Sequence, residues 1–124
     1  MYRSMMQVYV KGSNEAIEFY QKAFDAELLA KYTNEDGSAI MHAELNVYGQ
    51  IVSLSELPGN ETITGNTMQL CLHFGEGKES IVKKIYEVLK EGAKIYCPLS
   101  PCTFSPLMVH FCIVLGIVDL LNPF

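Results

Sequence analysis

The alternation of apolar and polar residues in the first half of the chain predicts a strand, a helix and two further strands. A short apolar run at residues 8–10 leads into an amphipathic helix that begins at Ser13. Two alternating runs follow at residues 38–48 and 50–56, joined by a tight turn at Gly49. The helix has an apolar stripe with the spacing of a core-covering face, formed by Ala16, Ile17, Tyr20, Ala23 and Phe24. We expect Ser13 or Asn14 to cap the start of this helix.

The second half of the chain repeats this order of elements. A strand at residues 68–74 precedes a helix at 78–91 that Gly92 ends, and a strand at 93–97 and an apolar stretch at 107–121 follow. The apolar stripe of the second helix consists of Ile81, Val82, Ile85, Val88 and Leu89.

The two halves therefore form an internal repeat. Glu15 and Ile17 in the first helix correspond to Glu79 and Ile81 in the second, about 64 residues further on. A unit of this kind buries one face of its sheet against its own helix, and two free sheet faces can then close around a pocket. We expect one α+β domain over residues 1–124, with repeat one at 1–60 and repeat two at 66–124, joined by a loop.

The predicted strands also have a polar face. Because successive side chains of a strand point to opposite faces, the apolar positions can face the helices while the positions between them point away. The helix-facing positions are Val8, Val10, Met41, Ala43, Leu45, Val47, Val52, Leu54, Met68, Leu70 and Leu72. The positions that point away are Gln7, Tyr9, His42, Glu44, Asn46, Ser53, Ser55, Thr67, Gln69, Cys71 and His73. A solvated sheet face would alternate in the same way, but the scarcity of Lys and Glu favours an enclosed pocket.

Composition and charge exclude some classes of function. The chain has 124 residues, a formal net charge of −5 and no run of Lys or Arg, whereas nucleic-acid binding needs a basic surface. No apolar segment of the signal-peptide kind follows Met1, and the stretch at 107–121 is shorter than the ~20 residues that span a bilayer. We expect no nucleic-acid partner, no signal peptide and no membrane segment, and we interpret residues 107–121 as buried strand.

The four cysteines, at positions 71, 97, 102 and 112, do not form a Cys-x-x-Cys pair. A structural zinc site is therefore not indicated, and disulfide frameworks are typical of secreted proteins. We expect a cytoplasmic protein with reduced and mostly buried thiols.

Several sequence motifs, in order, resemble one known superfamily. Residues 14–24 contain Asn-Glu-Ala-Ile-Glu-Phe-Tyr and, two residues later, Ala-Phe, and residues 40–45 read Ile-Met-His-Ala-Glu-Leu. Residues 53–56 read Ser-Leu-Ser-Glu ahead of Pro-Gly, and residues 92–99 contain Gly-Ala-Lys-Ile and then Pro-Leu. This pattern resembles the glyoxalase/bleomycin-resistance/dioxygenase, or vicinal oxygen chelate, superfamily and more narrowly its PhnB-like branch.

The resemblance implies a fold and an oligomeric state. The glyoxalase/bleomycin-resistance fold consists of two βαβββ repeats whose curved mixed sheets surround a cavity, and its members are usually homodimers. The branch has also carried a methyltransferase label, but this chain has no glycine-rich turn that could hold a nucleoside cofactor.

The resemblance also implies where a metal would bind. Enzymatic members hold one divalent ion with two His and two Glu from the first, fourth, fifth and eighth strands. Strand parity carries these positions to Gln7, Ser53, Thr67 and Asp119. Only Asp119 suits a hard or borderline metal, so we expect that the glyoxalase type of metal site is not retained.

The end of the chain departs from the branch pattern. The branch has Phe-Trp-Ser after the Pro-Leu strand, an Asp-Lys turn and a further Trp, whereas this chain has Phe104-Ser105 and an apolar Ile113-Val114. Residues 104–124 are therefore rebuilt, as one long strand or as an interface, or they are a diverged end. Because so long an apolar segment would expose a large patch, we expect it to be buried in the sheet or against a second subunit.

Several positions carry candidate chemistry. His42 and Glu44 lie about 7 Å apart on one strand face, where they could form an acid–base or ligand-anchoring pair, or satisfy each other within the sheet. With His73 they could instead form a shifted metal site. Tyr9 and Phe104 could stack on a planar ligand or pack in the core.

We predict a small-molecule-binding protein of the PhnB-like branch. The resemblance assigns it neither a specific biochemical role nor a cofactor. One alternative is a metal-dependent lyase, isomerase or dioxygenase with a shifted ligand set, and another is a sequestration-type resistance protein. The ligand-pocket candidates are Gln7, Tyr9, His42, Glu44, Ser53, Ser55, Thr67, Gln69, His73, Phe104 and Asp119.

Overall fold

The computed structural model describes residues 1–59, 69–75, 77–90, 94–102, 105–113 and 116–122; for Gln69 and from residue 94 onward the description covers the backbone. The chain divides into two compact units, Met1–Ile63 and Thr64–Phe124. None of the helices within these described ranges is long and apolar enough to cross a membrane.

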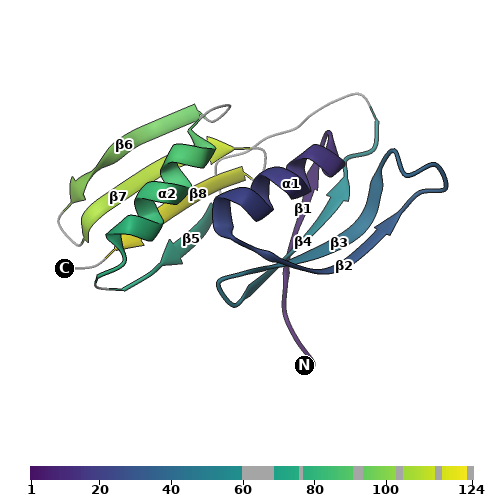
Figure 1. The fold of residues 1–124 in the computed structure, drawn as a ribbon, viewed down its shortest axis with the longest axis horizontal. Helices are drawn as coiled ribbons and strands as arrows, with labels where there is room; N and C mark the ends of the chain where they lie inside the picture. Colours follow the sequence, from purple (N-terminus) through teal and green to yellow (C-terminus); the bar gives the residue numbers. More distant parts are fainter. Residues whose placement is uncertain (60–68, 76, 91–93, 103–104, 114–115, 123–124) are drawn as a thin grey trace. The chain divides into compact units, whose positions relative to one another are not determined.

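The first unit is a four-stranded sheet with one helix. Its elements are β1 (Met6–Val10), α1 (Ser13–Phe24), β2 (Glu27–Thr33), β3 (Ile40–Val47) and β4 (Gln50–Glu56). The strand order is β1-β4-β3-β2, with β1 parallel to β4 and the other pairs antiparallel. The helix α1 lies along one face of this sheet and contacts β3 and β4 (Figure 1).

The second unit has the same topology. Its elements are β5 (Gln69–His73), α2 (Glu79–Leu89), β6 (Lys94–Cys102), β7 (Ser105–Ile113) and β8 (Gly116–Asn122). The strand order is β5-β8-β7-β6, again with one parallel pair, β5 and β8 (Figure 1). The predicted α+β class with two βαβββ repeats is confirmed, while a cavity shared by the repeats stays a prediction.

The core of the first unit follows the apolar pattern with one exception. The whole predicted stripe of α1 is buried, together with the helix-facing residues of β1 and β4 and most of those of β3. The exception is Met41, which was expected to face the helix and is 61% exposed. In the β2–β3 pairing the partner of Tyr32 is His42 and that of Thr33 is Ile40. Met41 is therefore the extra residue of a bulge, and Ile40 is buried in its place.

The start of α1 is capped by a distant strand and not by the predicted Ser13 or Asn14. The N-cap residue is Gly12, in a left-handed conformation with φ 69°. The carboxylate of Glu56, the last residue of β4, accepts the backbone N–H groups of Gly12 at 3.2 Å and Ser13 at 3.0 Å. The Ser13 hydroxyl also donates to Glu56 and accepts the N–H of Ile40, so it joins α1 to β3 and β4.

In the second unit, α2 buries Val82, Ile85 and Leu89, whereas Ile81 and Val88 are half-buried. The predicted stop at Gly92 and the loop at residues 60–66 lie outside the described residues. The apolar end of the chain forms two antiparallel strands, with Ile113 opposite Gly116. It therefore keeps a hairpin and is not one long strand.

Candidate functional site

The face of the first sheet that lies opposite α1 gathers polar side chains from three strands. In register, Gln7 of β1 is opposite Ser53 of β4, which is opposite Glu44 of β3. In the neighbouring rows Tyr9 is opposite Ser55, and Tyr32 of β2 is opposite His42. The sequence placed all of these except Tyr32 on this face.

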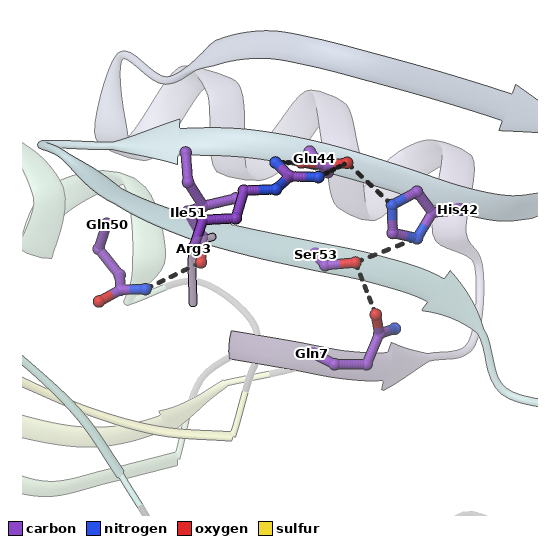
Figure 2. Close-up of polar contacts among 7 residues, drawn as sticks. All are labelled: Arg3, Gln7, His42, Glu44, Gln50, Ile51 and Ser53. Atoms are coloured by element: carbon purple, nitrogen blue, oxygen red, sulfur yellow. Dashed lines mark hydrogen bonds and ion pairs between the residues drawn. The ribbon is translucent and has the colours of Figure 1, made fainter. Parts of the chain in front are cut away.

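Six residues on this face are connected by hydrogen bonds, and we call them the polar network. They are Arg3, Gln7, His42, Glu44, Ser53 and Ser55. Figure 2 shows the side chains of five of them pointing toward one another above the sheet.

One end of the polar network fixes the direction of its hydrogen bonds. The amide nitrogen of Gln7 contacts the carbonyl oxygen of Val8 and the Ser55 hydroxyl, so the amide oxygen is the end directed at Ser53. The Ser53 hydroxyl donates its proton to that oxygen at 2.6 Å. The oxygen of this hydroxyl also lies 3.2 Å from Nδ1 of His42, so Ser53 links Gln7 to the imidazole.

The other end of the polar network is an anchored carboxylate. Glu44 is 7% exposed, and Oε2 lies 3.1 Å from Nε2 of His42. Arg3 reaches the carboxylate from the segment before β1 with both terminal nitrogens, one of them 3.2 Å from Oε2. The hydrogen bond from Arg3, and then that from His42, lowers the pKa of Glu44 below its ordinary value. Glu44 is therefore an anion at neutral pH.

The side chains at the centre of the polar network are arranged like a catalytic triad, with Ser53 as nucleophile, His42 as base and Glu44 as orienting acid. They cannot act as such a triad. Ser53 is completely buried, and its proton is directed at Gln7 rather than at the imidazole. A nucleophile must reach its substrate and be activated by the base. The geometry therefore supports recognition and proton-holding roles for these groups rather than acyl transfer through Ser53.

Two exposed tyrosines flank the polar network. Tyr9 on β1 is 58% exposed and Tyr32 on β2 is 64% exposed. The Tyr32 ring stacks on His42 with 6.4 Å between centroids. The two strands are separated by three strand spacings, which is about 14 Å. The polar network and the two tyrosines together form a surface of small-molecule dimensions.

The other predicted ligand-pocket residues belong to the second unit, and the structure describes some of them. Cys71 and His73 of β5 are exposed, so the expectation of mostly buried thiols is wrong for Cys71. The backbone register places Cys71 opposite Asp119 of β8 and Gln69 opposite Ile117. Thr67 and Phe104 lie outside the described residues. Among the side chains that are described, no three His, Cys, Asp or Glu residues gather in a way that could hold a metal ion.

Arg3 and Tyr32 are the members of this surface that the sequence analysis missed. Arg3 precedes the first strand and belongs to no periodic pattern. Tyr32 lies on β2, a strand that the residue pattern did not predict, because its side chains are exposed on both faces at the sheet edge.

Comparison with known proteins supports the sequence resemblance. The family model "Glyoxalase/Bleomycin resistance protein/Dioxygenase superfamily" matches residues 4–112. No curated protein matches the chain in sequence.

Several solved structures have a similar fold. Protein PA1353 from Pseudomonas aeruginosa has a TM-score of 0.79 at 18% identity, covering 99% of this chain and 98% of its own. The PhnB protein from Bacillus cereus, described as a putative 3-demethylubiquinone-9 3-methyltransferase, has a TM-score of 0.79 at 21% identity over 97% and 98% of the chains. A variant of the fosfomycin resistance protein FosX from Listeria monocytogenes, in complex with Mn(II) and a dihydroxypropylphosphonic acid, has a TM-score of 0.71 at 17% identity over 96% and 90%.

Proposed function

The chain belongs to the glyoxalase/bleomycin resistance protein/dioxygenase superfamily, and on this premise we propose that it is a cytoplasmic small-molecule-binding protein of the PhnB-like kind. The observation that carries the proposal is the polar network between two exposed tyrosines on the sheet face opposite α1. Buried polar groups in a fixed arrangement provide orientation, and the aromatic rings provide contact area.

The composition of the polar network favours binding over a metal-dependent reaction. Two of the four positions at which the superfamily's metal ligands would fall are Gln7 and Ser53, an amide and a hydroxyl that are hydrogen-bonded to each other. Neither is a strong ligand for a divalent ion, so these residues do not fit a metal of the glyoxalase type.

A metal-dependent lyase, isomerase or dioxygenase remains the second candidate, because the FosX variant with a similar fold is described with Mn(II). Metal analysis of the purified protein separates the two candidates. Our proposal expects substoichiometric zinc, nickel, manganese and iron, and one bound equivalent of any of them would favour the second candidate.

A ligand-induced melting screen tests binding itself, because a ligand that binds only the folded state raises Tm by mass action. Compounds that stabilise the wild-type protein should lose their effect in the Tyr9→Ala, Tyr32→Ala and Glu44→Gln variants. Glu18→Gln, which removes an exposed carboxylate from α1, is the matched control and should respond like the wild type. A screen without stabilising compounds, or hits that none of the three variants weakens, would contradict the proposal.

Turnover distinguishes a sequestration-type resistance protein from an enzyme. Saturable binding that leaves the compound chemically unchanged favours sequestration, and product formation favours an enzyme. We also propose a homodimer, in line with what the family resemblance implies.

A further inference from the structure

We propose that the ligand of this face is a small organic cation, with a guanidinium, amidinium or ammonium group, and that it binds Glu44 by displacing Arg3. This inference rests on the proposed binding function. It specifies the class of ligand and the ion pair that occupies the binding site in the free protein. The observation behind it is the Arg3–Glu44 pair (Figure 2).

The carboxylate of Glu44, 7% exposed with Arg3 in place, has a cationic partner in the structure. An ionised carboxylate removed from water is costly unless it is paired and hydrogen-bonded. In the structure the guanidinium of Arg3 makes this pair with both of its terminal nitrogens, the two-pronged geometry in which arginine recognises carboxylates. The sheet therefore contains a built anionic subsite for a planar cation.

The guanidinium that occupies the subsite comes from the segment before β1 and not from a strand of the sheet. Arg3 lies in residues 1–5, which precede β1 and have no regular secondary structure. Met1 and Tyr2 are almost fully exposed, and the Arg3 side chain remains 44% exposed beside Glu44. A guanidinium in this position can leave into water while an incoming cation keeps Glu44 paired.

The surroundings of the subsite suit a cation better than an anion. Tyr9 and Tyr32 are exposed on either side of the polar network, and the faces of aromatic rings attract cations. The net charge of the chain is −5, which attracts cations over longer distances. An anion that bound Arg3 and His42 would have to approach the Glu44 carboxylate, which both of them already contact.

The test compares three probes of similar shape and different charge: benzamidine, benzamide and benzoate. Their affinities are measured by calorimetry in one buffer at one ionic strength, so that only the charge of the probe differs. The proposal expects benzamidine to bind and the other two not to bind. Because the apparent Kd rises as the competent fraction falls, Arg3→Met should bind benzamidine about tenfold more tightly if Arg3 blocks Glu44 nine-tenths of the time.

Two further variants control this comparison. Glu44→Gln should weaken benzamidine binding about tenfold or more, since it removes the charge that is recognised. Lys22→Met removes a positive charge from the last turn of α1 and should leave the affinity as in the wild type. A tighter affinity in Lys22→Met equal to that of Arg3→Met would overturn the displacement mechanism.

A measurement on the wild-type protein avoids any effect of the substitutions on folding. Arg3 is the only arginine of the chain, so its side-chain Nε–H gives a single NMR signal. Saturation with benzamidine should move this signal to the position of a solvated arginine. An unchanged signal in a protein that binds benzamidine would show that Arg3 is a permanent structural partner of Glu44.

The outcomes separate this inference from the proposed function. Arg3-dependent binding of benzoate, or melting-screen hits that depend on Tyr9 and Tyr32 but are neutral or anionic, would overturn the cation assignment and leave the proposed function standing. Failure of every probe and of the whole screen would overturn both.

Discussion

Glu56, at the end of β4, accepts hydrogen bonds from both the backbone N–H and the hydroxyl of Ser13, at 3.0 and 2.8 Å. These two residues are 43 positions apart, so the first turn of α1 becomes complete only when β4 is in place beside β1. Burial raises the pKa of the Glu56 carboxyl, but the hydrogen bonds from Ser13 and Gly12 outweigh this effect and lower it overall.

The cap predicts a measurable loss of stability. Glu56→Ala should lower the free energy of unfolding by about 1–2 kcal/mol, because a capping group and its favourable interaction with the helix dipole are lost. Glu56→Gln keeps an acceptor and should cost about half as much. Urea denaturation followed by circular dichroism measures both. Equal stability of Glu56→Ala and wild type would show that solvent replaces the cap.

The bulge in β3 predicts a large loss of stability on truncation of one residue and almost none on truncation of its neighbour. Ile40 is completely buried, so Ile40→Ala should cost about 2–5 kcal/mol through lost burial and the cavity that it leaves. Met41→Ala should change stability by less than about 0.5 kcal/mol, since Met41 is exposed. The same denaturation experiment tests the pair, and a larger loss for Met41→Ala would contradict the bulge.

The regular periodicity of the sequence was sufficient for the elements that bury one face. The stripe of α1 and the alternation of Leu45, Val52 and Leu54 gave the helix, the strands and the face that carries His42, Glu44 and Ser53. Alternation fails at β2, where the edge position exposes both faces, and at Met41, where one extra residue shifts the phase by one position.

The contacts that the sequence could not predict are those between residues far apart in the chain. Glu56 caps α1, and Arg3 neutralises Glu44, 41 residues away. Local sequence patterns contain no signal for such pairs, because the neighbours of a paired glutamate or arginine in the sequence do not differ from those of an unpaired one. The folded sheet has to bring them together before their roles become visible.

The lowered pKa values of Glu44 and Glu56 predict a loss of stability in acid. Both carboxyls titrate below their ordinary value of 4.5 in the folded protein, so the unfolded chain takes up protons first as the pH falls. The stability that they contribute is therefore complete above about pH 4.5 and is lost as the pH falls through the folded values. Melting temperatures measured between pH 3 and pH 7 should fall below pH 4.5 in wild type and fall less in Glu44→Gln. A parallel fall in the two proteins would show that Glu44 does not contribute.

The proposed homodimer predicts a specific role for the apolar end of the chain. Residues 107–121 supply most of β7 and β8, and an apolar segment of this kind has to be covered within its sheet or by a partner. We expect light scattering at micromolar concentration to give twice the mass of 13.9 kDa, and residues 107–124 to resist limited proteolysis.

Removing these residues takes two strands out of the second sheet and should leave an insoluble or unfolded chain, because β5 then loses its hydrogen-bonding neighbour β8. A monomeric mass together with rapid cleavage inside residues 107–124 would contradict the dimer, and a folded, soluble truncated chain would show that this segment is dispensable.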